Sequence, residues 1–446
     1  MPPSLVEAVK AAGIVGAGGA GFPTHVKVGA RVEVVIANGA ECEPLLDCDK
    51  AVMEHFAPEV LRGLRLVVQA TGAKRAVIAL KGRYAPVVQA VRRAIGDASD
   101  VELHLLENFY PAGDEHVLVN LVTGRVIPEG GIPPAVGVMV DNVITLRNVA
   151  QCVDAGRPVT RRMLTVHGEV RRPVTVSLPV GAPFSAALEL AGGATCDEAV
   201  FVEGGPMMGQ VRTDPATPVS RVTSGIIVLP PSHPVPARKL QSIERELRIS
   251  KTVCCQCRFC TDLCPRFLLG HDLHPHLVMR SLNMQGVAES PSAHETSAFL
   301  CCLCGLCEVF ACPLGLSPRR VYEATKKSLA AAGVRNPHAR TDVRVRDVAD
   351  GRRIPLPRLV SRLGLSRYYG VHTEYLPGEI SLPWVRVPLG AHFGAPARPV
   401  ARVGDRVHEG DPVGEIPEGK LGARVHASIA GTVTAVNPSF VEIHKD

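Results

Sequence analysis

Eight of the fourteen cysteines lie in two dense arrays, and their spacing is typical of metal-binding thiolates. In each array two residues lie between the first and second cysteines and two between the second and third. Three or four further residues then precede a fourth cysteine, which is followed by proline. This spacing lets one tight loop aim three thiolates at a single iron–sulfur cubane, while the fourth ligand arrives from elsewhere. The first array comprises Cys254, Cys257, Cys260 and Cys264, and the second comprises Cys301, Cys304, Cys307 and Cys312.

The arrays resemble the cysteine run of bacterial ferredoxins, in which the cysteine before proline ligates the other cluster. The resemblance implies two [4Fe–4S] clusters with exchanged fourth ligands: Cys312 would join the first three cysteines, and Cys264 would join the second three. A pair of zinc sites is the alternative, but zinc usually takes two C-x2-C pairs. Cys255 and Cys302 adjoin ligands and are expected to be small buried hydrophobes.

A glycine-rich loop at residues 16–23 (GAGGAGFP) follows an expected helix at 5–12. A dinucleotide fingerprint would follow a strand, so the loop alone is equally consistent with a structural turn. Polar segments further along the chain accompany it. They are Lys27, residues 38–44 (NGAECEP), residues 110–115 (YPAGDE) and residues 141–142 (DN).

Together these segments resemble the flavin-binding, NADH-oxidising subunit of respiratory complex I over most of residues 10–150. The resemblance implies one noncovalent FMN, with NADH as the electron donor. The loop glycines would let backbone N–H groups approach the flavin, a lysine would supply positive charge, and residues 113–115 would receive NADH. The implied site residues are Gly16, Gly18, Gly19, Lys27, Asn38, Glu41, Tyr110, Gly113, Asp114, Glu115 and Asn142.

Four positions depart from that family's motifs. Ala40 stands where the family has Asp, Cys42 where it has Ser, Asp114 where it has Glu, and Asp141 where it has Asn. The flavin expectation does not depend on these positions. The nicotinamide expectation does, because smaller or altered acidic groups change the affinity for the dinucleotide. For Glu41 and Glu43, the alternative to a role in the site is an exposed pair.

The chain is expected to be an α/β multidomain protein of four parts. Residues 1–155 combine apolar strand-like runs (32–37 and 76–80) with helical patterns, which predicts a parallel sheet covered by helices. Residues 160–232 have short β-rich runs between Gly/Pro turns, and residues 230–236 are expected to be a linker. Residues 237–335 are predicted to be helical and to hold the clusters, residues 336–380 to be irregular, and residues 380–446 to be β-rich.

This order of parts resembles the C subunit of Rnf ferredoxin:NAD oxidoreductases and, more closely, the PduS-type cobalamin reductases. Residues 160–232 resemble their soluble-ligand-binding β-grasp module, including the GGPMMG segment at 204–209. Residues 380–446 resemble a barrel-sandwich hybrid, as in biotinyl and lipoyl carriers. The carrier lysine is replaced by the segment 424–426 (RVH), so a structural role is expected.

The position of the sandwich after the cluster segment is the PduS-type arrangement. The resemblance implies an NADH-dependent enzyme that reduces cobalamin inside a bacterial microcompartment for 1,2-propanediol. Its implied partners are cobalamin, a cobalamin adenosyltransferase and possible shell proteins. Two alternatives remain: an Rnf-like electron-entry subunit, which neighbouring genes for membrane subunits would indicate, and a non-catalytic cluster-bearing scaffold, which a colourless or cluster-only protein would indicate.

The bulk composition excludes other classes of protein. The net charge is +6, the sequence pI is about 8.6 and aromatic residues make up 4%, with no basic block or stacking platform for nucleic acid. No apolar run reaches the roughly 18 residues needed to span a bilayer. The N-terminus has no secretory pattern, so a cytoplasmic location with reduced thiols is expected.

Overall fold

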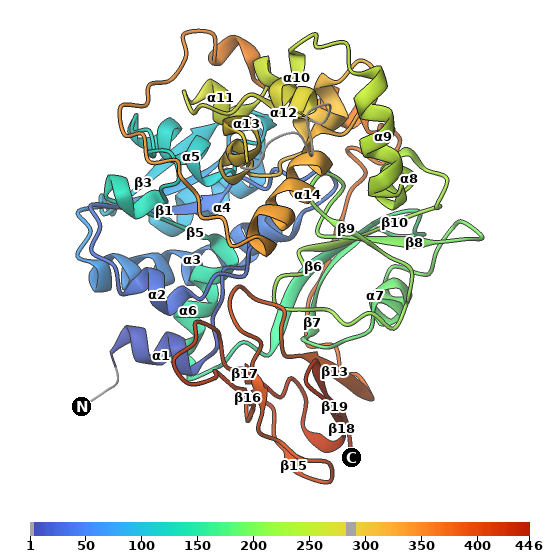
Figure 1. Ribbon diagram of the computed structural model, residues 1–446. Coiled ribbons are helices and arrows are strands. Elements are labelled where there is room, and N and C mark those ends of the chain that lie inside the picture. The colour runs from blue at the N-terminus through green and yellow to red at the C-terminus, as the bar shows by residue number, and fades with distance from the viewer. Residues whose placement is uncertain (1–3, 282–290) are drawn as a thin grey trace.

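The computed structural model describes residues 4–281 and 291–446 and contains four packed parts (Figure 1). We refer to residues 4–155 as the N-terminal domain, 160–232 as the middle domain, 237–335 as the helical domain and 380–446 as the C-terminal domain. In Figure 1 the N-terminal domain (blue to cyan) lies beside the middle domain (green). The helical domain (yellow to orange) lies over one end of both, and the C-terminal domain (red) lies at the opposite end.

The N-terminal domain is built on a parallel four-stranded sheet of order β3-β2-β1-β5, as the apolar runs predicted. β1 and β2 are almost wholly buried, because helices cover the sheet. The strands are β1 (Val34–Gly39), β2 (Arg75–Lys81), β3 (Val101–Leu106) and β5 (Val138–Asn142). The larger helices are α3 (Cys48–Thr71), α4 (Ala85–Ile95), α5 (Glu115–Thr123) and α6 (Val143–Ala155).

The carboxyl ends of β1 and β5 are adjacent, since Asn38 pairs in register with Asn142. Two short helices, α1 (Leu5–Ala11) and α2 (Thr24–Val28), flank the glycine loop. α1 begins with a capping box in which the Ser4 and Glu7 side chains satisfy each other's backbone N–H groups. Open parallel sheets bind ligands at their carboxyl edge, so this edge is where a site is expected.

The middle domain is a six-stranded mixed sheet of order β12-β7-β6-β10-β8-β9, packed against helix α7 (Phe184–Leu190). Its strands are β6 (Arg161–Gly168), β7 (Val174–Pro179), β8 (Val200–Glu203), β9 (Gln210–Arg212) and β10 (Gly225–Leu229). The edge strand β12 (Glu374–Leu376) comes from the segment that was predicted to be irregular, and it pairs parallel with β7. Three residues are too few for the period-2 pattern to reveal a strand in the sequence.

Helical structure begins before residue 237, the predicted start of the helical domain. Residues 230–236 were expected to be a linker, but α8 spans Pro234–Leu240. Proline is favoured in the first helical turn, where its missing N–H costs nothing, and the His233 side chain caps the helix by accepting from Val235 N. The longer helices that follow are α9 (Ile243–Val253), α12 (Pro275–Ser281) and α14 (Pro318–Ala331). Shorter helical turns, α10 (Phe259–Asp262), α11 (Pro265–Leu268) and α13 (Ala293–Thr296), lie around the cysteines.

The C-terminal domain packs two small sheets around a core made mostly of valines. One sheet has the order β13-β19-β18-β15 and the other β14-β16-β17. The strands are β13 (Trp384–Pro388), β14 (Arg398–Pro399), β15 (Arg406–Val407), β16 (Pro412–Glu415), β17 (Val425–His426), β18 (Gly431–Val436) and β19 (Phe440–His444). Between the helical and C-terminal domains, β11 (Ile354–Pro355) pairs with β4 (Phe109–Tyr110), and α15 (Leu356–Arg362) follows. Within residues 4–281 and 291–446, no helix has the length and apolar character needed to cross a bilayer.

Candidate flavin and iron–sulfur sites

A cleft of about 730 Å³ lies at the carboxyl edge of the parallel sheet, between the N-terminal, middle and C-terminal domains. Six predicted flavin residues line it. They are Gly18, Gly19, Asn38, Glu41, Gly113 and Asn142. The opposite wall comes from the middle domain (residues 203–224) and from Pro388 and Ala391 of the C-terminal domain. A volume of this size is within the range of cofactor sites, and such sites favour domain junctions.

The glycine loop is held open toward this cleft. Gly19 has a φ of +111°, and a Cβ there would meet no atom within 4 Å, so the backbone faces free space. The loop is fixed beneath by two hydrogen bonds at Ala17: its N–H donates to Thr145 Oγ1 at 2.9 Å, and its carbonyl accepts from Arg162 Nη2 at 2.9 Å. The loop can therefore present backbone N–H groups to an anionic or polar ligand, as the resemblance implied.

Asn38 joins the end of β1 to the segment 110–115. Its Nδ2 donates to the Gly113 carbonyl at 3.0 Å, and its Oδ1 accepts from Ala40 N at 3.2 Å. A Cβ on Gly113 would lie 3.1 Å from Cys42 Sγ and 3.2 Å from Ala40 Cβ. Two segments separated by about seventy residues of chain thus meet at one cleft wall, and the packing leaves little room for a larger residue than glycine.

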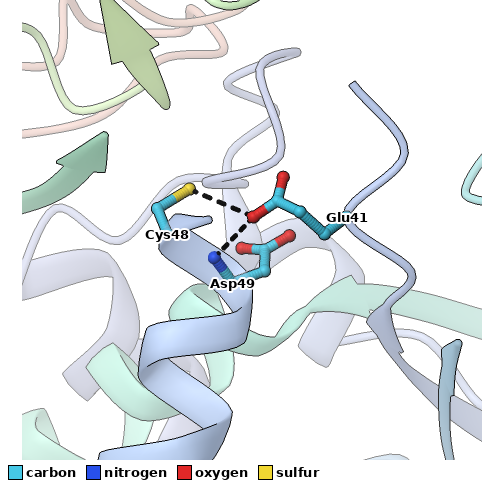
Figure 2. A group of neighbouring side chains, drawn as sticks. All are labelled: Glu41, Cys48 and Asp49. Carbon is cyan, nitrogen blue, oxygen red and sulfur yellow. Dashed lines mark hydrogen bonds between the residues drawn. The ribbon is translucent and has the colours of Figure 1, made fainter. Parts of the chain in front are cut away.

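Glu41, Cys48 and Asp49 form a buried cluster beside the cleft (Figure 2). Glu41 Oε2 accepts from Asp49 N at 2.7 Å and from Cys48 Sγ at 3.6 Å. Burial and the neighbouring Asp49 carboxyl raise the pKa of Glu41 to about 8. Asn142 Nδ2 donates to Asp49 Oδ2 at 2.9 Å, while its Oδ1 caps α6 through Ile144 N. The cluster therefore holds a proton at neutral pH and places it against the flavin cleft.

Lys27, predicted to supply positive charge to the flavin, is engaged by groups outside the cleft lining. Its ammonium donates to the Val140 carbonyl at 2.8 Å and pairs with Glu115 at 3.3 Å and Asp141 at 3.4 Å. These two carboxylates offset the burial of the lysine and raise its pKa. Lys27 does not line the 730 Å³ cleft, and neither do Gly16, Tyr110, Asp114 or Glu115.

Tyr110 and Asp114 instead connect the N-terminal domain to the helical domain. The Tyr110 hydroxyl donates to the Cys304 carbonyl at 2.7 Å. Asp114 caps α5 by accepting from His116 N and Val117 N, and its Oδ2 accepts from Arg266 Nη2 at 3.0 Å. Both members of this ion pair are nearly buried, with side-chain exposures of 13% and 8%.

The eight array cysteines gather around two cavities. One is lined by Cys264, Cys301, Cys304 and Cys307, and the other by Cys254, Cys257, Cys260 and Cys312. In each cavity the fourth cysteine comes from the opposite array, which is the grouping that the ferredoxin resemblance implied. Cys302 and Cys255 also line these cavities. Cys255 is exposed, so the expectation that it is a buried hydrophobe is wrong, because the loop that carries it lies at the surface.

The donor set fits an iron–sulfur cluster in both cavities. Burial and, to a smaller extent, the neighbouring Cys257, Cys254 and Cys312 raise the pKa of Cys260 to about 12. Burial raises the pKa of Cys264 as well. Four thiols crowded in one buried place are costly as bare thiolates, and bound iron cations would compensate their charge. The cavity of Cys304 is the more enclosed, since Cys257 is exposed and Cys304 is buried.

Four stretches of the chain match known families. Residues 9–151 match the Nuo51 FMN-binding domain, residues 163–211 the SLBB domain, residues 253–317 a 4Fe-4S dicluster domain, and residues 378–446 the RnfC barrel sandwich hybrid domain. The predicted fold class and the predicted FMN-binding and dicluster domains are therefore confirmed.

Whole-chain relatives decide the family. Cobalamin reductase PduS of Salmonella typhimurium is 43% identical over 98% of this chain and 95% of its own length. Cobalamin reductase PduS of Citrobacter freundii is 43% identical over 99% of this chain and 96% of its own. The chain belongs to the PduS family. The C subunit of the Na⁺-translocating ferredoxin:NAD⁺ oxidoreductase complex of Acetobacterium woodii is 34% identical over 59% of this chain and 58% of its own length.

In this member of the PduS family, the sequence analysis did not find the partners of Glu43 or any role for Lys239. Glu43 accepts from Met207 N at 2.9 Å and Met208 N at 2.8 Å, so it fixes the GGPMMG segment against the cleft. Lys239 donates to the carbonyls of Met207 and Gly209, and burial lowers its pKa to about 8. The alternative of an exposed pair for Glu41 and Glu43 is therefore wrong.

Met207 links the two kinds of site. Its side chain is fully buried in a core that also contains Cys304 and Leu306, and its Cε would lie 3.4 Å from a Cβ on Gly305. Its neighbour Met208 is half exposed in the flavin cleft. Met207 and Met208 therefore lie between the flavin cleft and the cavity of Cys304, with one residue packed toward each. No local spacing in the sequence could have indicated this contact, because Met207 and Cys304 are distant in the chain.

The C-terminal domain completes the cleft from the side of the glycine loop. Phe393 N donates to the Gly21 carbonyl at 2.9 Å, and the rings of Phe22 and Phe393 lie 5.5 Å apart between centroids. A Cβ on Gly21 would lie 2.9 Å from His392 Cα, so only glycine permits this approach. The domain therefore has a packing contact with the glycine loop, in keeping with the structural role expected for it.

Proposed function

We propose that this protein is an NADH-dependent cobalamin reductase that carries electrons from NADH through FMN and two [4Fe–4S] clusters to cob(II)alamin. The balanced reaction takes NADH and two cob(II)alamin to NAD⁺, H⁺ and two cob(I)alamin. When bound, FMN accepts a hydride as two electrons and releases them singly, and each cluster carries one electron at a time. The observation that carries the proposal is the contact of Tyr110, from the flavin-binding domain, with Cys304 in the dicluster domain.

The chain's residues have distinct roles in this proposal. Gly18, Gly19 and Asn38 would bind the flavin at the cleft, and Glu41 would hold a proton beside it. The neighbourhood of Glu115 would receive NADH. The cluster of Cys264, Cys301, Cys304 and Cys307 would accept electrons from the flavin side, because its cavity adjoins Tyr110 and Arg266.

The second cluster would deliver electrons outward. Its cavity includes the exposed residues Cys257, Gln256 and Arg258, whereas the cavity of Cys304 is enclosed. A one-electron donor must come close to its acceptor, so the exposed cluster is the better placed to meet a corrinoid. In this proposal the protein works in a bacterial microcompartment, with an adenosyltransferase and shell proteins as partners, as the resemblance to PduS-type reductases implies.

The Rnf-like alternative has weaker support. The Acetobacterium relative matches 59% of this chain, whereas the Salmonella relative matches 98%. The scaffold alternative predicts a protein without bound flavin, although the cleft has the size and the backbone donors that FMN needs.

The test is anaerobic turnover of the purified protein with NADH and cob(II)alamin, with an adenosyltransferase and ATP present to trap cob(I)alamin. Cys304→Ala should keep reduction of the flavin by NADH and lose cobalamin turnover. Cys196→Ala, a cysteine of the middle domain outside both cavities, is the matched control and should keep both steps. Normal cobalamin turnover by Cys304→Ala would mean that electrons leave directly from FMN, and the proposed path would be wrong.

A further inference from the structure

A second cavity of about 470 Å³ lies away from the flavin cleft and shares no lining residue with it. It opens where α3 and α6 of the N-terminal domain meet β6 and β7 of the middle domain, the segment beside β12, and one loop of the C-terminal domain. Its size is within the range of small-molecule sites, and its position at a junction of domains is typical of such sites. Neither the flavin nor the clusters require it.

One wall of this cavity is apolar. Phe56, Ile144, Val159, Met163 and Tyr375 contribute to it. One face of Tyr375 is already covered, because the ring stacks on His55 with 4.3 Å between centroids. Phe56 and Tyr375 are only half-buried, so part of each ring stays open to the cavity for an apolar body.

The other side is cationic. Arg147 of α6, Arg161 at the start of β6, and Arg157 between these two elements line the cavity. Arg147 is already engaged, since its Nε pairs with Glu59 at 2.9 Å and its guanidinium lies 3.6 Å from the centre of the Phe56 ring. Arg157 is exposed at the surface of this region. Among the described arginines of this lining, Arg161 is the one with a shielded donor that has no partner.

Arg161 is half-buried and lacks the carboxylate partner that a shielded guanidinium normally has. Its Nη2 donates to the carbonyls of Ser177 at 2.9 Å and Ile380 at 3.3 Å, which fix its position. Its Nε is shielded from solvent and has no hydrogen-bond partner, and no carboxylate lies within 4.0 Å among the residues that the structure describes. Burial lowers the pKa of Arg161, and Glu379 and Glu409 act on it only at longer range.

A shielded cationic donor without a partner is unfavourable, and an anionic group at Arg161 Nε would provide a charge-assisted hydrogen bond there. The two acidic residues of the lining do not fill this role. Glu409 is exposed and accepts from Thr160 Oγ1 at 2.7 Å, and Glu379 is exposed.

We propose that this cavity is a second ligand site, which binds a small organic anion with its phosphate or carboxylate group at Arg161 and its flat or apolar body against Phe56 and Tyr375. The site is separate from the electron path, because its lining includes no cysteine and no residue of the glycine loop. Its occupation would connect three domains, since its walls come from all of them. The ligand therefore has the character of a regulator or stabiliser rather than a substrate.

The test is calorimetric titration of the full-length, cofactor-loaded protein with four probes: AMP, adenosine, inorganic phosphate and benzoate. AMP and benzoate distinguish a phosphate ligand from a carboxylate ligand. Adenosine tests the flat body without the anion, and inorganic phosphate tests the anion without the body. We expect AMP or benzoate to bind at least about tenfold more tightly than adenosine, because the anion supplies the charge-assisted contact.

Two variants locate the binding. Arg161→Met should weaken the anionic probe by at least about tenfold, and Asn148→Trp should abolish its binding by filling the cavity from α6. Arg358→Met, an exposed arginine of α15 outside the cavity, should bind as the native protein does. Flavin content and NADH oxidation without the probe should stay at native levels in all three.

The proposal is overturned if none of the four probes binds below about 10 mM, which is weaker than a specific small-molecule site. It is equally overturned if both Arg161→Met and Asn148→Trp bind the anionic probe with native affinity, since the binding would then be elsewhere. Because Arg161→Met removes two structural hydrogen bonds, Asn148→Trp decides the outcome if the first variant fails to fold.

Discussion

Tyr110, in the flavin-binding domain, donates its hydroxyl hydrogen to the backbone carbonyl of Cys304 at 2.7 Å. Tyr110 is fully buried, and its ring belongs to the same core as Cys304, Met207 and Leu306. The contact joins the segment after β3 to the loop that would hold a cluster, across 194 residues of chain. It joins the flavin-binding domain to the dicluster domain by one buried hydrogen bond.

Tyr110→Phe should therefore affect the step between flavin and cluster more than any other. The Cys304 carbonyl would lose its buried donor, which should lower the free energy of unfolding by about 1–2 kcal/mol. In anaerobic stopped-flow measurements, flavin bleaching by NADH should keep its native rate, while cluster bleaching slows. The control is Tyr368→Phe, which removes a hydroxyl that donates to Glu169 in the middle domain. It should lower the free energy of unfolding by a similar amount and leave the rates of flavin and cluster bleaching unchanged. Native cluster bleaching in Tyr110→Phe would show that the contact is merely structural.

The exchange of the fourth ligands can be tested by pairs of variants. Anaerobically purified native protein should contain about eight irons, because two cubanes hold four each. Cys312→Ala should remove the same electron paramagnetic resonance signal as Cys257→Ala, although the two cysteines belong to different arrays. Cys264→Ala should likewise match Cys304→Ala. If Cys312→Ala instead matched Cys304→Ala, each array would hold its own cluster, and an iron content near four would contradict the two-cluster prediction.

Gly19 should be the loop glycine on which flavin binding depends most. Its φ of +111° strains any other residue, and a side chain there would occupy the open cleft. Gly19→Val should lose most of the FMN that acid releases from the native protein. Gly404→Val is the matched control, because Gly404 has a φ of +93° and open surroundings in the C-terminal domain, away from the cleft. Flavin retention by Gly19→Val equal to that of Gly404→Val would contradict the assignment of the loop.

Gly18 gives a graded comparison at the neighbouring position. A Cβ on Gly18 would meet Asn142 Cβ at 3.6 Å, which is ordinary contact. Gly18→Ala should therefore keep more flavin than Gly19→Ala does, while the larger Gly18→Val should lose it. Acid extraction and fluorescence of the released flavin measure the difference.

The Glu41 cluster predicts how stability depends on pH in the flavin-free protein. Burial raises the folded-state pKa of Glu41 to about 8, above its ordinary value of 4.5. The folded state then holds a proton that the unfolded state has released, so this contribution to stability is fully present below pH 4.5 and is lost as the pH rises through 8. Glu41→Gln should flatten the decline of the unfolding free energy between these values, as measured by denaturant titration at several pH values. An equally steep decline in the variant would assign the proton to another group.

Glu115 should act on the dinucleotide step. It pairs with Lys27 at 3.3 Å, and its side chain is 44% exposed, so it can be reached by a ligand. Glu115→Ala should slow bleaching of the flavin by NADH while FMN content stays near native, because Lys27 keeps Asp141 and the Val140 carbonyl as partners. Glu107→Ala, which removes an exposed partner of Arg353, is the control and should leave the rate unchanged. A loss of FMN as large as the loss of rate would show that Glu115 has a structural role.

The sequence by itself determined the parts whose information is local. The C-x2-C-x2-C spacing gave the cluster chemistry, because three thiolates on one short loop need no distant residue to converge. Apolar runs such as residues 76–80 indicated the parallel sheet, since strands buried on both faces are largely apolar along their length. The glycine loop and its polar companions gave the flavin-binding domain through their order in the chain.

Only the tertiary structure decided how these parts meet. The local sequence could not show that Lys27 pairs with Glu115 and Asp141 outside the cleft lining. Nor could it show that Glu43 holds the GGPMMG segment beside Cys304. The strand β12 and helix α8 were missed because short elements gain their stability from packing against neighbours and not from their own pattern. Buried charges find their partners across domains, since desolvation makes an unpaired charge too costly, and such pairs as Asp114 and Arg266 leave no periodic trace in the sequence.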